Sequence, residues 1–392
     1  MVRVDFNVPL RGRRVGDDTR IRAAMPTIRY LSESGAIVIL ISYLGRPEGR
    51  VVEELRLAPV AKKLNHILEE NMEEKPFLGQ FFYLTRSIGP VVEAAVKKAK
   101  PGDIILLENI RFYREEIEAN PHFALLLSRF GNIYVNEAFS VSHRNEASIT
   151  GVPQMLPSYA GLEFLREIKY LGDLFKNIKH PFVLVLGGVK ISDKIGVIRK
   201  LGSKADVVLT GGGVANIFLE AAGYKIGKSA AEENQLFRAK TLLEKFGDKI
   251  VLPRDVVLSD STQADIPAKP KIFRAQRRQA LLICKKGQAI LDIGPKTAKS
   301  YIEKIKKAKT IVWSGPLGKF EEAGFSRGTA FVGEAIAEVG LTDAVAIAGG
   351  GDTDEAIKKF RMQGFDHVSM GGGAMLKFLE GDNFPGIEAL RS

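Results

Sequence analysis

The stretch AVAIAGGGDTDEAIKKF, residues 344–360, consists of an apolar run, three glycines and a segment with apolar residues at helical spacing. A nearly continuous apolar run is typical of a strand that is buried on both faces of a sheet. Glycines directly after such a run mark a turn into the next element. Strands that alternate with helices form βαβ units around a parallel sheet. This stretch therefore predicts a fold of the α/β class.

The same order of apolar run, turn and amphipathic segment recurs along the chain. The other examples in the second half are PFVLVLGGVKISDKIGVIRKL (residues 181–201), ADVVLTGGGVANIFLEAAG (205–223), TIVWSGPLGKFE (310–321) and DHVSMGGGAMLKFLEG (366–381). The apolar runs of the first half are VRVDFNV (2–8), GAIVILISYL (35–44), DIILLENIRF (103–112) and NIYVNEAF (132–139). Helical patterns between them are APVAKKLNHILEEN (58–71) and GPVVEAAVKKA (89–99).

Length and turn signals predict two domains. A chain of 392 residues is longer than a single hydrophobic core usually supports. The segment GVPQMLPSYAG (residues 151–161) is rich in proline, glycine and small residues, and the helical pattern LEFLREIKYLGDLF (162–175) follows it. Segments of this composition mark domain boundaries. We therefore expect two α/β domains joined by a helix.

The composition describes a globular protein with a basic surface. The net charge of +11 is compatible with nucleic acid, an acidic membrane surface or small anionic substrates as partners. One cysteine, Cys284, excludes an intrachain disulfide and indicates a cytoplasmic location. The N-terminus MVRVDFNVPLRGRR carries charges where a signal peptide is apolar, and the apolar runs are too short to span a membrane. We expect no membrane association and no zinc site, because no Cys/His cluster occurs.

Five glycine-rich turns in the second half predict a phosphate site. The first amides of a helix have no intrahelical partner and attract phosphate, and glycine lets an anion approach the backbone. Ligands of open parallel sheets bind at the carboxyl ends of the strands, where these glycines fall. A single Gly-Gly pair is more often only a tight turn, so the prediction rests on five of them in one domain. The P-loop motif is absent, and Asn216 interrupts the dinucleotide fingerprint.

Lys190 and Lys194 follow the first of these turns, in GGVKISDKI. Their spacing of four predicts that they lie on one face of a helix. Two solvated lysines on an exposed face are the alternative in a basic protein. Lysines in the first turns of a helix oppose the macrodipole and become favourable when a polyanion binds nearby. We therefore expect both lysines to contact phosphate groups.

The first half holds a second cluster of cations. Arg46, Arg111 and Arg144 lie at or just beyond the ends of apolar runs, and Arg20 follows the segment DDT. The planar guanidinium fits carboxylate and phosphate groups, so converging arginines would form a pocket for a small phosphorylated acid. Asp5 and Asn7 of DFNVP could hydrogen-bond substrate hydroxyl groups, and an Asx turn that ends at Pro9 is an equally good interpretation. No nucleophile motif is present, and direct transfer of phosphate between two substrates would need none.

These motifs together resemble the phosphoglycerate kinase family. The matching blocks, in the order of the family, are RVDFNVP (3–9), SYLGRP (42–47), ENIRFY (108–113), VNEAFSVSHR (135–144), LGGVKISDKI (186–195), TGGGVAN (210–216), DIGPKT (292–297), WSGPLGKFE (313–321), GGGDT (349–353) and SMGGGAMLKFLEG (369–381). The resemblance covers essentially the whole chain.

The resemblance implies two Rossmann-like, three-layer α/β/α domains with parallel sheets that face each other across a cleft. It implies a 3-phosphoglycerate domain formed by residues 1–155 and a tail at about 375–392, a connecting helix at 156–175, and a nucleotide domain at 176–374. The implied reaction is reversible phosphoryl transfer between 1,3-bisphosphoglycerate and Mg-ADP, with hinge closure of the two domains. We expect a monomer, with a homodimer as the alternative, and no nucleic-acid partner.

The resemblance also implies roles for individual residues. Residues implied to bind the acid substrate are Asp5, Phe6, Asn7, Arg20, Tyr43, Arg46, Arg111 and Arg144. Residues implied to bind the nucleotide are Lys194, Gly212, Gly213, Glu321, Gly350, Gly351, Asp352 and Thr353. Residues implied in the transfer itself are Arg20, Lys190, Lys194, Gly372 and Gly373. Asp352 is also implied to face Mg²⁺, which would explain a carboxylate beside a phosphate cradle.

The sequence departs from the family pattern at three places. Tyr43 stands where the family usually has a histidine beside the substrate, and Ser314 replaces an asparagine. The chain also begins just before RVDFNVP, where relatives usually have further residues. None of the three departures removes a charged group that is assigned to the transfer.

Three other functions remain as alternatives. An acyl-phosphate kinase with another acid substrate is disfavoured by the DFN, GR and SHR blocks, which match the glycerate pocket. A nucleic-acid binder is suggested by the charge and by RAQRRQ (residues 274–279), but no motif of such a protein is present. A non-catalytic relative is disfavoured because Arg20, Lys190, Lys194 and Asp352 are all retained.

Overall fold

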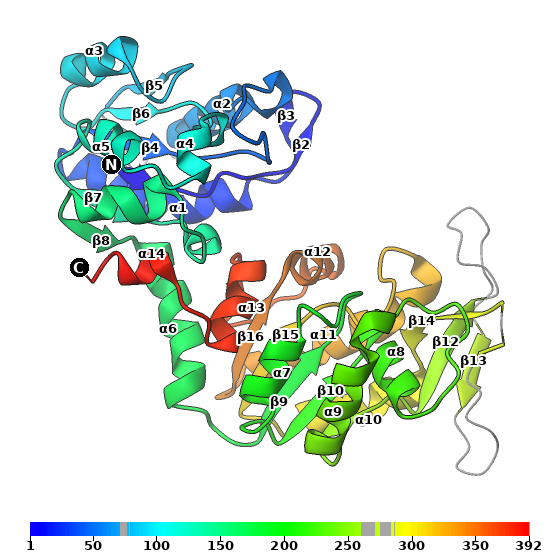
Figure 1. The fold of residues 1–392 in the computed structure, drawn as a ribbon. Coiled ribbons are helices and arrows are strands. Elements are labelled where there is room, and N and C mark those ends of the chain that lie inside the picture. The colour runs from blue at the N-terminus through cyan, green and yellow to red at the C-terminus, as the bar shows by residue number, and fades with distance from the viewer. Residues whose placement is uncertain (71–76, 78, 260–270, 275–283, 286, 392) are drawn as a thin grey trace. The chain divides into compact units, whose positions relative to one another are not determined.

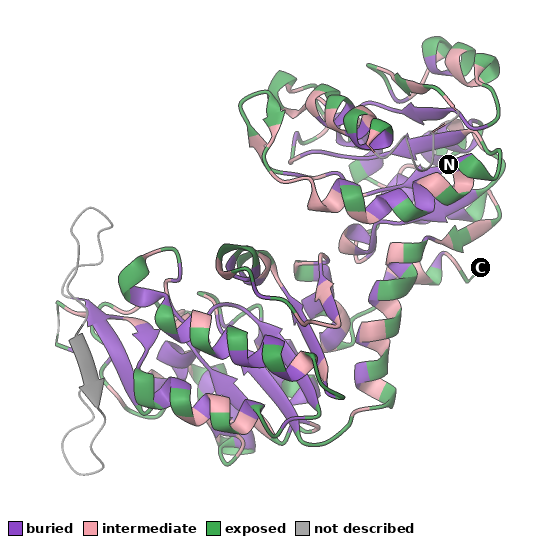
Figure 2. Ribbon diagram, turned by 180° about the vertical axis from the view of Figure 1, so that it is seen from behind, coloured by how far each residue is buried: buried purple, intermediate pink, exposed green. Residues whose placement is uncertain are grey.

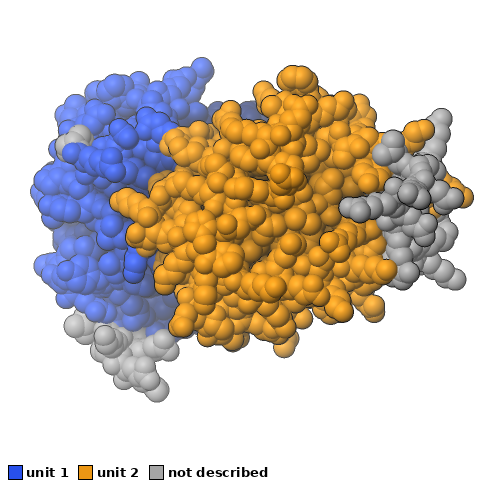
Figure 3. Space-filling model, turned by 90° about the horizontal axis from the view of Figure 1, so that it is seen from below, with its two compact units in different colours: residues 1–169, 383–392 blue, residues 170–382 orange. Residues whose placement is uncertain are grey.

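The protein, described here from a computed structural model, divides into two compact units. All residues are described except 71–76, 78, 260–270, 275–283, 286 and 392. Unit 1 consists of Met1–Lys169 and Asn383–Ser392, and unit 2 of Tyr170–Asp382 (Figure 3). The division along the chain falls within helix α6 (Leu162–Lys176). At the other end, unit 2 includes the whole of α13 (Gly373–Glu380), whereas the expected boundary near residue 375 lies inside this helix.

Unit 1 is built on a six-stranded sheet with the order β5-β6-β4-β1-β7-β8. Its described strand pairs are all parallel. The strands are β1 (Val2–Arg3), β4 (Val38–Ile41), β5 (Phe81–Tyr83), β6 (Ile104–Leu106), β7 (Tyr134–Asn136) and β8 (Ser158–Ala160). The helices are α1 (Thr19–Glu33), α2 (Ala58–Glu69), α3 (Pro90–Lys98), α4 (Arg114–Ile117), α5 (Pro121–Ser128) and α14 (Pro385–Glu388). Strands β2 (Leu10–Arg11) and β3 (Arg14–Val15) form a separate antiparallel hairpin.

The strand β4 shows why the apolar runs of unit 1 are continuous. Val38 and Leu40 belong to one core cluster, which includes residues of α1 and α2. Ile39 and Ile41 belong to a second cluster, which includes residues of α3 and α5. Because successive side chains of a strand point to opposite faces, both faces of this sheet are covered and every position of β4 is buried. Figure 2 shows the central strands of the two parallel sheets as buried and the outer faces of the helices as exposed.

Unit 2 contains a second parallel sheet, with the order β11-β10-β9-β15-β16-β17 (Figure 1). The strands are β9 (Phe182–Leu186), β10 (Val207–Thr210), β11 (Ile250–Val251), β15 (Thr310–Ser314), β16 (Val345–Gly349) and β17 (His367–Ser369). The helices of this unit, besides α13, are α7 (Ile195–Leu201), α8 (Gly212–Ala221), α9 (Leu236–Phe246), α10 (Pro295–Ile305), α11 (Arg327–Gly340) and α12 (Gly351–Phe360).

The strand order of unit 2 reverses between β9 and β15. From β9 the chain adds β10 and β11 on one side, and β15, β16 and β17 then extend the sheet on the other side. The loops after two adjacent strands therefore lead in opposite directions and leave a crevice at the carboxyl edge of the sheet. This is the position at which open parallel sheets bind their ligands.

The predicted α/β class with two parallel sheets is confirmed by this topology. The antiparallel sheet β13-β12-β14 of unit 2, formed by Lys271–Arg274, Asp255–Ser259 and Ala289–Ile293, was not predicted. The prediction that Lys190 and Lys194 share a helix face is wrong, because α7 begins only at Ile195. The residues before it form a turn, in which the amide of Lys194 donates to the carbonyl of Ile191 at 2.8 Å.

Candidate active site

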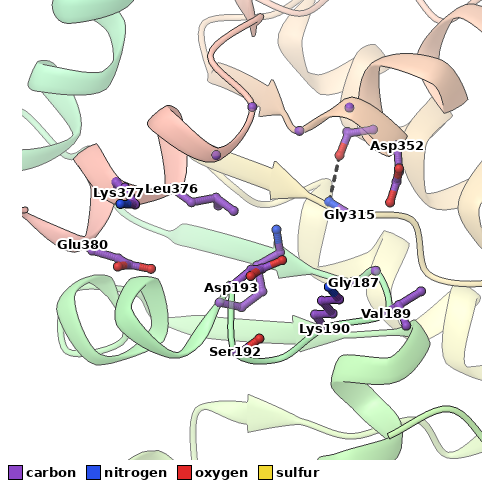
Figure 4. A pocket seen from close by; sticks show the side chains of 17 residues that line it. Gly187, Val189, Lys190, Ser192, Asp193, Gly315, Asp352, Leu376, Lys377 and Glu380 are labelled. Carbon is purple, nitrogen blue, oxygen red and sulfur yellow. Dashed lines mark hydrogen bonds between the residues drawn. The ribbon is translucent and has the colours of Figure 1, made fainter. Parts of the chain in front are cut away.

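A cavity of about 570 Å³ lies at the carboxyl edge of the unit 2 sheet (Figure 4). Its lining comes from the loops after β9, β15, β16 and β17 and from the helices α12 and α13 that follow two of them. The lining residues are Gly187, Gly188, Val189, Lys190, Ser192, Asp193, Lys194, Gly315, Gly350, Gly351, Asp352, Thr353, Gly372, Gly373, Leu376, Lys377 and Glu380. Four separate strand–helix junctions thus contribute to one site.

Glycine is required where the loops after β9 and β15 touch. A Cβ atom on Gly187 would lie 2.0 Å from the carbonyl oxygen of Pro316, and one on Gly315 would lie 2.3 Å from that of Gly187. No side chain fits at either position, so the two loops can lie this close together only because both residues are glycine. This contact forms the floor of the cavity between the two central strands.

Two helices begin at the cavity with their first amides close to its lining. Helix α12 begins at Gly351 and α13 begins at Gly373, and both residues line the cavity. A Cβ atom added to either glycine would meet no other atom within 4 Å. The positive ends of two helix dipoles and open space beside the backbone together suit a phosphate group.

Lys194 is the buried cation of this cavity. Its Nζ atom donates a hydrogen bond to Oγ of Ser314 at 2.9 Å. Burial lowers the pKa of Lys194 to about 8, against the opposing effect of the negative charges of Asp193, Asp352 and Glu380. Lys190, by contrast, is exposed, and among the described residues its ammonium group has no hydrogen bond or ion pair.

Among the described residues, Asp352 is one of three acidic residues that line the cavity, with Asp193 and Glu380. This residue lies in the first turn of α12 and is exposed. The neighbouring Thr353 is fully buried, and its Oγ1 accepts a hydrogen bond from the amide of Gly315 at 2.8 Å. The Thr353 hydroxyl therefore connects the loops after β16 and β15, while the Asp352 carboxylate remains available to a ligand.

The described part of the chain contains no group of three or more His, Cys, Asp or Glu side chains suited to hold a metal ion by themselves. A Mg²⁺ ion that accompanies a nucleotide usually takes only one or two carboxylates, together with phosphate oxygens and water. An exposed carboxylate beside a phosphate cradle fits such an ion. Asp193 and Asp352 both line the cavity and are exposed, and Asp352 is the one that lies in the first turn of α12.

Eight predicted residues line the cavity and three do not. Those that line it are Lys190, Lys194, Gly350, Gly351, Asp352, Thr353, Gly372 and Gly373, and those that do not are Gly212, Gly213 and Glu321. Gly212 and Gly213 start α8, where a Cβ atom on Gly213 would lie 2.2 Å from the carbonyl oxygen of Val189. Glu321 is exposed, and its carbonyl oxygen accepts a hydrogen bond from Lys359 at 2.9 Å.

Sequence reasoning missed the charged residues Asp193, Lys377 and Glu380 of the cavity. Asp193 is adjacent to Lys194 in the sequence, and no role was predicted for it. Lys377 and Glu380 lie on α13, four and seven residues after Gly373. Residues four and seven positions after the start of a helix lie on the same face as its first residue. This spacing from Gly373 is the sequence signal that could have identified Lys377 and Glu380.

Unit 1 brings the predicted residues around Asp5 together. The Asp5 carboxylate forms an ion pair with Arg20 and accepts a hydrogen bond from the hydroxyl of Ser140. Its Oδ1 atom also accepts the amide of Asn7 at 2.9 Å, which is an Asx turn. The side-chain oxygen of Asn7 accepts the amide of Gly45 at 2.9 Å. Asp5 and Asn7 thus organise the loops after β1 and β4.

The remaining predicted residues of unit 1 differ in their burial and in their hydrogen-bond partners. Phe6 is fully buried in the core, so only its backbone could reach a ligand. Arg111 is 6% exposed, and its guanidinium donates to Glu146 at 2.8 Å and to the carbonyl of Gly45 at 3.2 Å. Arg46 is exposed and Arg144 is half-buried. The described residues give no hydrogen bond or ion pair to the guanidinium groups of Arg46 and Arg144, and both are free to bind an anion.

Two other predictions concern partners. Residues 275–279 of the basic run RAQRRQ lie outside the described residues. No helix within the described part of the chain combines the length and apolar character that crossing a membrane requires.

Comparison with known proteins gives one consistent result. The sequence model of a family described as "Phosphoglycerate kinase" matches residues 1–382. The phosphoglycerate kinase of Moorella thermoacetica is 45% identical over 394 residues, which cover 100% of this chain and 95% of that protein. The phosphoglycerate kinase of Dictyoglomus turgidum is 44% identical over 395 residues, with the same coverage.

Solved structures agree with the sequence comparison. The phosphoglycerate kinase from Coxiella burnetii has a TM-score of 0.83 and 36% identity, and the one from Pyrococcus horikoshii OT3 has a TM-score of 0.84 and 31% identity. Each comparison covers 100% of this chain and 95% of the solved chain.

Proposed function

The chain belongs to the phosphoglycerate kinase family, and we propose that it catalyses the reversible transfer of a phosphoryl group between 1,3-bisphosphoglycerate and ADP. The observation that carries this proposal is the unit 2 cavity, in which the buried Lys194, the starts of α12 and α13 and the carboxylate of Asp352 line one space. Such a set of groups suits the phosphates of a nucleotide together with its magnesium ion.

In the direction of ATP use, a carboxylate oxygen of 3-phosphoglycerate attacks the terminal phosphorus of ATP. The bond from that phosphorus to the bridging oxygen of ADP breaks, and ADP leaves. The protein needs no attacking side chain, because this reaction depends on positioning and on neutralising the charge of the phosphoryl oxygens. Each residue of the chain can therefore be assigned either to holding a substrate or to stabilising the transferring group.

In unit 2, we assign the transferring group to Lys194 and to the backbone amides at Gly372 and Gly373. Lys190 is exposed, and we assign to its side chain a second positive charge for the transferring group. Because Lys194 is 7% exposed, its charge acts in a region of low dielectric, where it interacts more strongly with phosphate than it would in water. Magnesium, when bound with the nucleotide, neutralises phosphate charge, and Asp352 would hold it directly or through water.

The remaining residues of unit 2 predicted to bind the nucleotide receive different roles. We assign Gly350 and Gly351 to the phosphates. Gly212, Gly213 and Glu321 lie outside the cavity lining, so we assign them to parts of the nucleotide beyond the phosphates. The hydroxyl of Thr353 is occupied by the amide of Gly315, so its role is to position the loop.

In unit 1, we assign binding of 3-phosphoglycerate to the cluster described above. Arg46 and Arg144 have guanidinium groups without protein partners in the described structure, so they can pair with the substrate without breaking an existing contact. Arg20 is held by Asp5, and we assign to it both the acid substrate and the transferring phosphoryl group. Because each unit holds one substrate, we propose that the units approach during turnover, which would exclude water from the reacting atoms.

We further propose a cytoplasmic, monomeric enzyme. A single cysteine in 392 residues suits a reducing compartment. A monomer is sufficient for the proposed mechanism, which needs residues of one chain only.

The proposal is tested by release of ADP from Mg-ATP in the presence of 3-phosphoglycerate, with the acyl-phosphate product trapped. The Arg20→Ala and Lys194→Ala variants should each lose on the order of a hundred- to a thousand-fold in kcat. Arg22→Ala, on the same helix as Arg20, and Lys240→Ala, at an exposed position of α9, are the matched controls and should keep normal turnover. A parent chain without turnover, or full activity in both site variants, would refute the proposal.

A further inference from the structure

The ring of Tyr43 lies directly against the guanidinium of Arg111. The Cζ atom of Arg111 is 3.8 Å from the centre of the ring, which is van der Waals contact. The Cζ atom of Arg3 is 5.1 Å from the same ring. The negative face of an aromatic ring attracts a cation at these distances. Tyr43 therefore contributes to the placement of two positive charges in unit 1.

Arg111 is fixed from three directions. The ring of Tyr43 covers one face of the guanidinium, the carboxylate of Glu146 accepts at 2.8 Å, and the carbonyl of Gly45 accepts at 3.2 Å. A guanidinium has five N–H donors, and the described protein groups use two of them. The described residues give the other three donors no partner, and the plane in which they lie is set by the surrounding contacts.

The charge balance around Arg111 also favours an anionic ligand. Glu146 faces two guanidinium groups, because its Oε2 atom lies 3.5 Å from Arg3 and its Oε1 atom 2.8 Å from Arg111. A second carboxylate, Glu116, also interacts with Arg3, and burial raises its pKa to about 7, so at neutral pH it carries only part of a negative charge. The two carboxylates therefore offset the two guanidinium groups only in part, and net positive charge remains. The aromatic face of Tyr43 lowers the repulsion between the two arginines and leaves their positive charges in place. A further ionised carboxylate at this position would neutralise one of them.

The hydroxyl of Tyr43 has no comparable role within the protein. Tyr43 is 4% exposed, and the described residues offer its hydroxyl no hydrogen bond. The contacts of this side chain with charged groups are made by the ring. A phenylalanine at this position would therefore keep the interaction that an aliphatic residue would lose.

From these contacts we infer that Tyr43 is a positioning residue, whose ring orients Arg111 so that its free N–H groups meet the acid substrate. The inference rests on the proposed function, because it deepens the role of the same substrate site. It assigns the effect of Tyr43 to Arg111 and not to a direct hydrogen bond with the substrate. The residue thus determines affinity for the phosphorylated acid while the transfer machinery of unit 2 is unaffected.

A double-mutant cycle tests this inference, with KM for 3-phosphoglycerate and its dissociation constant in the absence of nucleotide as the two readouts. Tyr43→Leu should raise both by about tenfold, in the range expected for a desolvated cation–π contact, with a much smaller change in kcat. Tyr43→Phe should keep most of the affinity. In an Arg111→Lys background, Tyr43→Leu should add less than about a twofold change, because coupled residues are not additive.

Controls separate this test from effects on folding and from the proposed function. Tyr30→Leu, at an exposed tyrosine of α1, should leave both constants unchanged. If Tyr43→Leu does not fold, Tyr43→Met replaces the ring with an unbranched side chain and serves in the same cycle. Equal losses in Tyr43→Phe and Tyr43→Leu, or losses that multiply with that of Arg111→Lys, would overturn the inference even when the parent chain turns over normally. Absence of turnover in the parent chain would instead refute the proposed function.

Discussion

The Nζ atom of Lys194 lies 2.9 Å from Oγ of Ser314, and this neutral hydroxyl is the hydrogen-bond partner of the buried ammonium group. No carboxylate is paired with Lys194 in the described structure, although Asp193, Asp352 and Glu380 act on it from a distance. The folded protein therefore holds a positive charge that lacks a close counter-ion. A bound phosphate group would supply that counter-ion.

Lys194 should make the unliganded protein less stable at neutral pH. Its pKa in the folded state, about 8, is lower than its ordinary value of 10.5. Between these two values the unfolded chain binds more protons, so stability rises with pH. Lys194→Met should therefore raise the melting temperature at pH 7 by a few degrees, on the order of 1 kcal/mol. It should also lower kcat on the order of a hundred- to a thousand-fold, as expected for Lys194→Ala. Calorimetry measures the change in melting temperature. The difference in melting temperature between Lys194→Met and the parent should disappear near pH 10.5, where Lys194 is neutral in the folded state and half-protonated in the unfolded chain.

Lys240→Met is the matched control for this experiment, because Lys240 is exposed and its removal should leave the melting temperature unchanged. A Lys194→Met variant that melts at a lower temperature than the parent at pH 7 would contradict the predicted cost of the buried charge.

The same pKa predicts the pH dependence of catalysis. The profile of kcat/KM for Mg-ATP reports groups of the free enzyme, so it should fall as pH rises above about 8, where Lys194 loses its proton. Ser314→Ala removes the acceptor that favours the charged form, so the fall should begin at a lower pH. Initial rates across this pH range at subsaturating nucleotide measure both effects. A falling limb at the same pH in parent and variant would argue against this role of Ser314.

Two glycines at helix starts should respond in opposite ways to alanine. Gly373 has open space around its Cβ position, so Gly373→Ala should fold with unchanged stability but collide with a bound phosphoryl group. We expect a loss of at least about tenfold in kcat/KM for Mg-ATP. In Gly213→Ala the new Cβ atom would lie 2.2 Å from the carbonyl oxygen of Val189, so this variant should lose stability. Thermal melts and initial rates distinguish the two, and normal turnover in Gly373→Ala would exclude close contact with the transferring group.

Asp352 should determine how much magnesium the enzyme needs. Asp352→Asn removes the carboxylate from the cavity, so the magnesium concentration for half-maximal rate at fixed ATP should rise by about tenfold. Asp354→Asn is the matched control, because Asp354 lies on the same helix and forms an ion pair with Lys358 at 2.7 Å. A magnesium titration of initial rates checks both variants. Equal requirements in Asp352→Asn and the parent would show that the ion is held without this residue.

Most of the fold could be predicted from sequence because its strands are buried on both faces. The run VILI of β4 is apolar at every position, and glycines follow most strands of unit 2, so strand, turn and helix are marked in order. The sheet β13-β12-β14 escaped prediction because Asp255–Ser259 and Ala289–Ile293 are paired over a long separation in sequence. No local pattern distinguishes such an antiparallel pair from two further strands of the main sheet.

Part of the site could be predicted because backbone and charge requirements appear in the sequence itself. Asp352 and the glycines around it were predicted in this way. The difference between Lys190 and Lys194 could not be, because it depends on where α7 begins and on the burial of one ammonium group beside Ser314. Lys377 and Glu380 were missed because their α13 positions meet the loop after β9 only once the chain has folded.

The segment Asn383–Ser392 belongs to unit 1 although it follows the whole of unit 2 in the chain. Within it, Phe384 stacks on Phe139 with ring centres 5.5 Å apart, and the amide of Gly386 donates to the carbonyl of Ser142 at 2.9 Å. During synthesis on the ribosome, all residues of unit 2 are made before helix α14, which belongs to unit 1. Until residues 383–391 are synthesised, the surface around Phe139 in the nascent first unit is not covered by Phe384.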